Sequence, residues 1–140
     1  MSEREEYVRR LWKRFREGGI DALLADAPRG VVWEPYGAGD RLIEPDELRE
    51  FFASVEGGGS GREALIWELH EVRGHVLAIG SVRWPVGQGY SEVLAAWVFF
   101  FDRDGRLFRA ATYGSPEEAG RALLAVEDTG RGDEPAQVGG

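Results

Sequence analysis

The sequence contains no cysteine, one methionine and, at Lys13, one lysine among 17 basic residues. Without cysteine, the chain cannot form disulfide bonds, thiolate metal sites or a thiol nucleophile. No apolar run approaches the ~18 residues that span a bilayer, and the first ten residues are charged rather than apolar like a leader. We therefore expect a soluble cytoplasmic protein that has no membrane partner.

Positive charge is also scarce relative to negative charge. The chain has 25 acidic residues and a formal net charge of −8, and its arginines alternate with acids along the sequence. Binding to nucleic acid needs a clustered positive field. We therefore expect no nucleic acid partner.

Aromatic residues are abundant instead, at 11% of a chain that is 43% hydrophobic, and they include five tryptophans. A chain of 140 residues suits one domain with a substantial core, and so many large rings suggest a wide interior or a lined pocket. We expect the domain to cover residues 1–126, because residues 127–140 form a polar segment rich in glycine and proline that is typical of disorder.

Apolar spacing predicts four helices. The first covers Glu3–Glu17, stops at Gly18 and Gly19, and is followed by a short helix over residues 20–26. A third begins at Pro45 and a fourth at Pro116, since proline suits the first helical turn. Ser115 and Glu118 match a capping box for the last helix. The expected buried faces of the last two helices consist of Leu48, Phe51, Phe52, Val55, Ala119, Ala122, Leu123 and Val126.

Five segments have the composition of β-strands. A short one ends near Pro35, and four longer ones are separated by glycine-containing turns. Such short connections require antiparallel neighbours. The longer strands are expected over Glu63–Arg73, Val76–Pro85, Ser91–Phe101 and Leu107–Tyr113.

This order of elements predicts an α+β protein in which helices cover one face of a curved antiparallel sheet. The sheet would wrap around the N-terminal helices as a cone, and its open end would leave a cavity lined by aromatic side chains.

The segments VVWEPYG, DELREFF and FFFDRDGRLFRAATYGSPEEA, in this order, resemble the nuclear-transport-factor-2-like superfamily. Within it they are most similar to the SnoaL-like and ketosteroid-isomerase-like proteins. The resemblance covers residues 5–125 and implies the cystatin-like α+β roll. It also implies a small, largely apolar ligand, no cofactor and a homodimer formed through the convex face of the sheet.

The resemblance also suggests catalytic residues. The aspartate that moves protons in the isomerase-like members falls on Glu34, and the neutral acid that assists it falls on Trp97, whose indole retains one N–H donor. The tyrosine donor of the first helix has no counterpart, but Tyr36 could enter the same space. The implied activity is proton transfer, of isomerase or cyclase type, on an apolar substrate that bears a carbonyl group.

A binding protein of the same fold without catalysis, serving as a ligand-binding or dimerisation module, is the alternative function. Glu34 would then be a carboxylate at the cavity edge held by an arginine such as Arg41. In either case strand alternation and the resemblance predict that the pocket is lined by Trp12, Phe15, Phe52, Trp84, Phe99, Phe108 and Thr112.

Two further predictions concern the remaining aromatic and histidine residues. Trp33 should face away from Glu34 and belong to a dimer surface, as should Trp67 together with Leu65 and Leu69. The histidines, His70 and His75, are expected to be structural or solvated, and no metal site is predicted.

Overall fold

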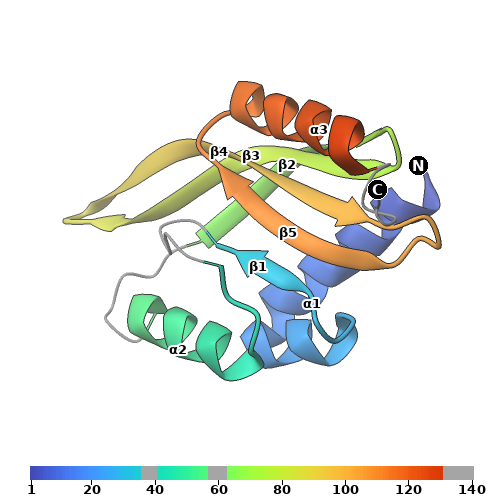
Figure 1. Ribbon diagram of the computed structural model, residues 1–140. Coiled ribbons are helices and arrows are strands. Elements are labelled where there is room, and N and C mark those ends of the chain that lie inside the picture. The colour runs from blue at the N-terminus through green and yellow to red at the C-terminus, as the bar shows by residue number, and fades with distance from the viewer. Residues whose placement is uncertain (36–40, 57–62, 131–140) are drawn as a thin grey trace.

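The computed structural model describes residues 1–35, 41–56 and 63–130. It confirms the α+β class, with three helices arranged around one five-stranded curved sheet that does not close (Figure 1). The elements in chain order are α1 (Glu3–Asp26), β1 (Val32–Glu34), α2 (Pro45–Glu56), β2 (Glu63–Val72), β3 (His75–Val86), β4 (Gly89–Phe101), β5 (Leu107–Tyr113) and α3 (Pro116–Gly130).

Helix α1 joins the first two predicted helices across a kink at Gly19. The backbone of Gly19 has φ 75° and ψ −162°, a region that is essentially restricted to glycine. Ser2 and Glu5 form a reciprocal capping box at the start of α1. The kink thus separates a long amphipathic segment from a second segment, residues 20–26, that runs in a new direction.

The sheet has the strand order β1-β5-β4-β3-β2. Strands β2 to β5 are antiparallel neighbours as predicted, but β1 pairs with β5 in parallel, so the sheet is mixed rather than purely antiparallel. The connection from β1 to β5 passes through α2 and three strands, which allows a parallel arrangement. The turn between β2 and β3 uses Arg73 and Gly74, both with positive φ.

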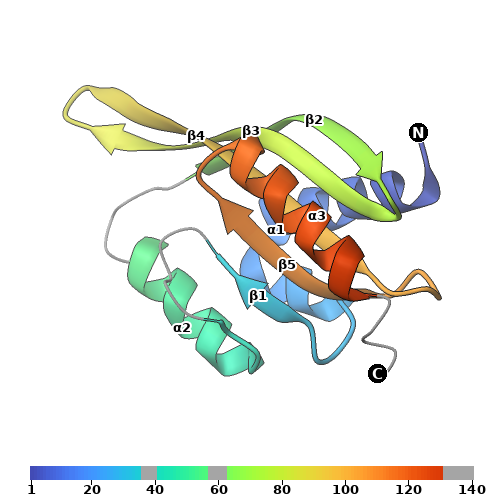
Figure 2. The same cartoon turned by 45° about the horizontal axis from the view of Figure 1, so that its top comes forward.

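Helices pack on both faces of the sheet, whereas the order of elements in the sequence predicts them on one face. The inner face packs against α1 through side chains that include Val76, Ala95, Trp97 and Phe99. The outer face packs against α3, and Figure 2 shows this helix lying across it. The buried residues of this second cluster are Ala96, Val98, Phe100, Ala111, Ala119 and Leu123.

The N-terminus of α3 differs in detail from the predicted capping box. The Ser115 hydroxyl accepts the Glu118 N–H at 3.2 Å as expected, but the Glu118 carboxylate accepts the N–H of Gly114 instead of that of Ser115. The helix also continues over residues 127–130, which were predicted to open the polar tail. The side chains of Val55 and Val126 lie outside the described residues, as does the segment 131–140.

The β3–β4 hairpin is longer than its neighbours and extends away from the rest of the molecule in both views (Figures 1 and 2). Its pairing is regular up to Val86 and Gly89. In the part of the chain that the structure describes, no helix combines the length and apolar character needed to cross a bilayer.

Candidate functional site

A cavity lies between the inner face of the sheet, the two segments of α1, and α2. Its open space is about 130 Å³. The cavity wall is mostly apolar and aromatic, and consists of Leu11, Trp12, Phe15, Leu23, Trp33, Glu34, Pro35, Leu48, Phe51, Phe52, Glu63, Ala64, Val82, Trp97, Phe99, Ala110 and Thr112.

Strand alternation explains which sheet residues reach this wall. Trp97 lies opposite Thr112 on the neighbouring strand, and Phe99 lies opposite Ala110. Residues directly opposite each other share a face of the sheet, so these four side chains lie together on the inner face. The structure thus places Trp97, Phe99 and Thr112 in the cavity wall.

The helical part of the wall contains a chain of touching rings. Trp12 lies 5.4 Å from Trp97 between ring centroids, and Phe15 lies 5.4 Å from Phe52. Phe51 packs edge to face on Phe52 at 5.3 Å. These contacts bring α1, α2 and the sheet together, and they place Trp12, Phe15 and Phe52 on the wall as predicted.

Two predicted wall residues do not line the cavity. Trp84 packs, partly buried, against the inner core. Phe108 is 42% exposed and its ring contacts Phe100, which belongs to the outer face. The pairing between β4 and β5 shifts at this point, from Phe100 opposite Arg109 to Phe101 opposite Leu107. The extra residue at this bulge reverses the alternation, and Phe108 turns away from the cavity.

The orientation of Glu34, which the sequence left open, follows from the pairing of β1 with β5. In the parallel pairing of β1 with β5, Trp33 lies opposite Ala110 and Glu34 lies opposite Ala111. Ala110 belongs to the inner core and Ala111 to the outer core. The expectation that Trp33 and Glu34 face opposite ways is confirmed, but Trp33 takes the inner side. Trp33 therefore lines the cavity instead of a dimer surface.

Two arginines hold the Glu34 carboxylate at the cavity edge. Arg109 Nη2 donates to Oε1 at 3.0 Å, and Arg41 Nε lies 3.0 Å from Oε2. The guanidinium of Arg109 also stacks over the Phe100 ring, 4.9 Å from its centroid, which places it on the outer face. The Glu34 side chain is only 21% exposed, so these pairs are partly shielded from water. The contact with Arg41, which the sequence left open as an alternative, is present.

A second carboxylate in the wall, Glu63, was missed by the sequence analysis. Arg83 Nε donates to it at 2.9 Å, and Arg16 lies 3.6 Å away. Glu63 is the first residue of β2, and its only signal in the sequence was this position at the start of an alternating apolar strand. Among the described wall residues, the charged side chains are thus two glutamates, each paired with two arginines.

Three side chains of the wall carry a polar group that could bond to a ligand. The indole N–H of Trp12 is buried and has no hydrogen-bond partner within the described residues. Trp97 and Thr112 also line the cavity, and their side chains carry an indole N–H and a hydroxyl. An unpaired donor in an apolar environment costs free energy, so these groups favour an occupant that can accept a hydrogen bond.

The two histidines are not part of the cavity wall. His70 Nε2 lies 2.8 Å from the Glu68 carboxylate on the surface, and the buried His75 accepts the Phe101 N–H through Nδ1 at 3.0 Å. Over the described ranges, no group of three potential metal ligands lies together. Tyr36, the other predicted donor, lies outside the described residues.

Tyr113 lies beside the Glu34 pairs on the outer face. Burial raises the pKa of its phenol, an effect that neighbouring Arg109 partly opposes. Its hydroxyl is buried without a hydrogen-bond partner in the described part of the chain, as is Arg109 Nε. These groups lie beneath the protein surface on the side of the sheet away from the cavity, so they do not extend its wall.

No family model matches the sequence, and none of the curated proteins matches it. Solved structures do share the fold. An NTF2-like protein of unknown function from Burkholderia pseudomallei has a TM-score of 0.66 at 22% identity, covering 86% of this chain and 97% of the other. TerC, co-crystallised with polyporic acid, has a TM-score of 0.67 at 21% identity, covering 89% and 99%.

A protein described as a SnoaL-like polyketide cyclase, from Shewanella putrefaciens, is also similar. Its TM-score is 0.61 at 12% identity, covering 89% of this chain and 88% of the other. The chain therefore has the NTF2-like, SnoaL-like fold. At these identities the comparisons establish the fold alone, and the function has to be argued from the cavity.

Proposed function

We propose that this protein binds a small, uncharged and largely apolar ligand in the cavity between α1, α2 and the inner face of the sheet. The observation that supports this most directly is the composition of the wall, where aromatic rings from three elements surround one open space. Ligand sites are typically concave and apolar, with a few polar groups that orient the ligand.

The charges around the cavity favour an uncharged ligand. Glu34 and Glu63 are each already paired with two arginines. A charged ligand would have to lose its hydration without gaining a free partner of opposite sign among the described wall residues, which is costly. An uncharged ligand avoids that cost.

The polar groups of the wall favour a ligand that carries one carbonyl or hydroxyl oxygen. Trp97 and Thr112 lie opposite each other on β4 and β5, so an indole and a hydroxyl-bearing side chain share the inner face beside the cavity. An indole can only donate a hydrogen bond, and a hydroxyl can donate or accept. The oxygen of an aryl ketone or a phenol would fit this pair.

Two relatives in fold are connected with small organic compounds. TerC was crystallised with polyporic acid, and another relative is described as a polyketide cyclase. Both descriptions apply to those proteins. For this chain they support the proposal that the same fold accommodates a small organic compound.

Proton transfer, with Glu34 as base and Trp97 and Tyr36 as donors, is the second candidate function. It is favoured by one observation, the presence of Glu34 in the cavity wall. It requires the carboxylate to leave Arg41 and Arg109 and turn inward, because both of its oxygens are paired with a guanidinium group where it stands. Binding without catalysis needs no such rearrangement.

Two matched compounds test the proposed ligand class. Indane and 1-indanone have the same ring skeleton and differ by a carbonyl group, and calorimetry measures their binding to the purified protein. We expect both to bind and the ketone to bind more tightly. Thr112→Val and Trp97→Phe should each reduce that preference by about three- to tenfold, the effect of one hydrogen bond. Thr112→Ser, which keeps the hydroxyl, should retain it. If neither compound binds the wild-type protein, the proposed ligand class is wrong.

We further propose a homodimer formed by the part of the outer face that α3 leaves uncovered. This outer patch consists of Leu65, Ile79, Tyr90 and Leu94; Tyr90 and Leu94 are 66% and 45% exposed. Leu69, expected beside Leu65, instead packs inward because β2 has a bulge between Ile66 and Glu68. An isologous dimer would bury the same patch on both copies.

The test is the mass in solution by sedimentation equilibrium. The wild-type protein should sediment with twice the chain mass, and Leu94→Asp with the chain mass. A control variant on a different surface, Leu124→Asp, should remain dimeric, because Leu124 lies on the exposed side of α3. A monomeric wild-type protein would contradict the dimer.

A further inference from the structure

Helix α2 forms one side of the cavity but is attached to the rest of the molecule mainly through α1. Leu48, Phe51 and Phe52 face the cavity from this helix. In the described part of the chain its principal packing partner is α1, and it has no comparable packing against the sheet. Figure 1 shows α2 set apart from the sheet at the side where α1 ends. The cavity wall therefore includes an element with few anchors.

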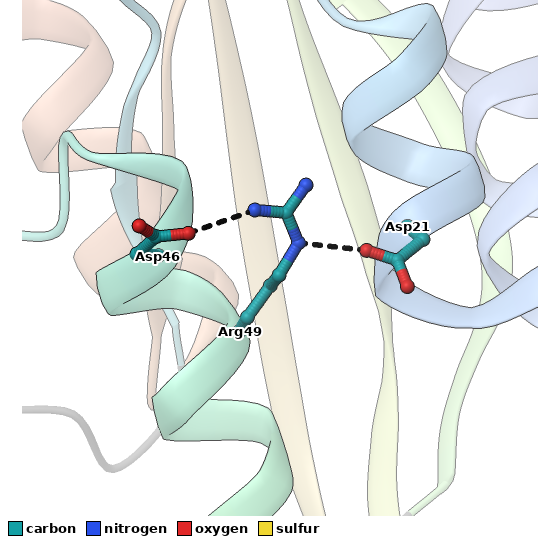
Figure 3. A network of polar contacts seen from close by, with 3 residues as sticks. All are labelled: Asp21, Asp46 and Arg49. Atoms are coloured by element: carbon teal, nitrogen blue, oxygen red, sulfur yellow. Dashed lines mark hydrogen bonds and ion pairs between the residues drawn. The ribbon is translucent and has the colours of Figure 1, made fainter.

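One of these anchors is a polar bridge on the outer side of α2. Arg49 Nε donates to Asp21 Oδ1 at 2.7 Å, and Arg49 Nη1 donates to Asp46 Oδ1 at 3.0 Å (Figure 3). Asp46 lies one turn before Arg49 on the same helix, so this contact stays within α2. The contact with Asp21 then links α2 to α1.

The position of Asp21 depends on the kink in α1. Asp21 lies two residues beyond Gly19, whose backbone conformation redirects the helix. The same segment contributes Leu23 to the cavity wall. The kinked segment thus lines the same cavity as α2 through Leu23 and contacts α2 through an ion pair at the surface.

The strength of this ion pair suits a contact that opens and closes. The side chains of Asp21 and Arg49 are 77% and 47% exposed, and exposed pairs of this kind add little to stability and are weakened by salt. Losing the pair would leave the fold intact, because the inner and outer cores do not include it. It would, however, remove a specific restraint on α2.

We propose that α2 is the movable wall through which ligands enter and leave the cavity, and that the Asp21–Arg49 ion pair restrains its opening. This inference rests on the proposed function as a ligand-binding protein. It makes ligand exchange dependent on salt, while the affinity changes little, because opening accelerates binding and release alike.

The test compares two aspartate variants that touch the same guanidinium. Asp21→Asn removes the link between the helices, and Asp46→Asn removes only the contact within α2. Stopped-flow fluorescence with the uncharged probe N-phenyl-1-naphthylamine measures both rates. Asp21→Asn should accelerate binding and release by about two- to fivefold, as expected for one exposed pair, and Asp46→Asn should remain near wild type. Added salt should raise the binding and release rates of the wild-type protein toward those of Asp21→Asn. The rates of Asp21→Asn itself should not change with salt.

A ligand-free measurement separates this inference from the proposed function. Hydrogen exchange of the α2 amides in the free protein should accelerate by about two- to fivefold in Asp21→Asn but not in Asp46→Asn. If the probe does not bind the wild type but the exchange rates differ in this way, the ligand-binding function is wrong and the restraint stands. If the probe binds and the two variants behave alike in both measurements, the restraint is wrong.

A cross-link gives the opposite perturbation. The chain has no cysteine, so Asp21→Cys combined with Arg49→Cys provides a unique pair for a short bis-maleimide linker. The linked protein should release the probe at least about tenfold more slowly than the same variant unlinked, because α2 can no longer separate from α1. Unchanged release after complete linking would overturn the movable wall.

Discussion

The inner and outer faces of the sheet are built from alternate residues of the same strands, yet they pack in opposite ways. On the outer face, small residues such as Ala96 and Ala111 let α3 approach closely, and Phe100 is fully buried among them. On the inner face, large rings meet α1 and α2 and leave a cavity between them. The outer face is therefore covered by α3, whereas the inner face combines the larger buried core with an open space.

The reason lies in the shapes of the side chains that meet. Ala119 and Leu123 of α3 pack with Ala96 and Ala111 in one buried cluster, and small side chains of this kind allow a helix and a sheet to pack closely. On the inner face, rings from α1, α2 and the sheet meet at a tilt or edge to face around the open space. Neighbouring residues on one strand should thus respond differently to the same substitution.

The largest difference is expected between Phe100→Ala and Phe99→Ala. Removing the fully buried Phe100 ring from the outer core should lower the free energy of unfolding by about 3–5 kcal/mol. Phe99→Ala should cost about half as much, because its ring already borders open space. Urea denaturation measures both. Equal losses would show that the inner face is as tightly packed as the outer one.

Ala111→Leu and Ala110→Leu provide the reverse comparison. The added atoms at Ala111 must displace α3, which should cost about 1–3 kcal/mol of unfolding free energy. At Ala110 they enter the cavity, so stability should change by less than about 0.5 kcal/mol, while the affinity for N-phenyl-1-naphthylamine falls at least tenfold. Retained probe binding in a folded Ala110→Leu protein would place the ligand outside this cavity.

Glu34→Gln tests whether this side chain acts inside the cavity or only in its ion pairs with Arg41 and Arg109. Losing the charge should weaken the contacts with Arg41 and Arg109 and lower the unfolding free energy by about 1 kcal/mol. Probe affinity should stay within about twofold of wild type, because the carboxylate turns toward the outer face. A folded variant that no longer binds the probe would show that Glu34 acts inside the cavity, as the proton-transfer hypothesis requires.

The smallest expected effect concerns the N-terminus of α1, which anchors the helix on the inner face. Glu5 accepts the backbone N–H of Ser2, and this hydrogen bond holds the pKa of its carboxyl below the ordinary 4.5. The lowered pKa means that the ionised form stabilises the folded state above the pKa of the unfolded chain, and that this contribution is lost as the pH falls. Glu5→Gln should therefore melt slightly earlier than wild type at neutral pH.

The melting difference should disappear once the pH falls below the folded-state pKa of Glu5, where the wild-type side chain is also uncharged. Thermal unfolding at a series of pH values measures this. A melting difference that persists unchanged in acid would show that the charge of Glu5 has no part in it.

Much of the fold could be predicted from the sequence, because its signals are local. Period-two alternation and glycine turns located β2 to β5, and Pro45 and Pro116 marked the starts of two helices. The same alternation placed Trp97, Phe99 and Thr112 on one face. The alternation failed at two strand bulges. One extra residue in β5 turned Phe108 outward, and another in β2 placed Leu65 and Leu69 on opposite faces of the sheet.

The candidate site was less accessible to sequence reasoning. Glu34 was found by its resemblance to a catalytic position, but its orientation follows from the pairing of β1 with β5, which lie about 75 residues apart in the chain. The arginines that hold Glu34 and Glu63 likewise come from distant segments. No local pattern encodes such contacts.

The sequence by itself determined the class of the protein, the location of most strands and helices, and the aromatic character of its interior, because these depend on composition and on short-range periodicity. The tertiary structure alone decided which way Glu34 faces, that α3 covers the outer face, and that α2 forms one side of the cavity. Those outcomes depend on long-range pairing, on one glycine kink and on two bulges, which set the direction of side chains only after the chain has folded.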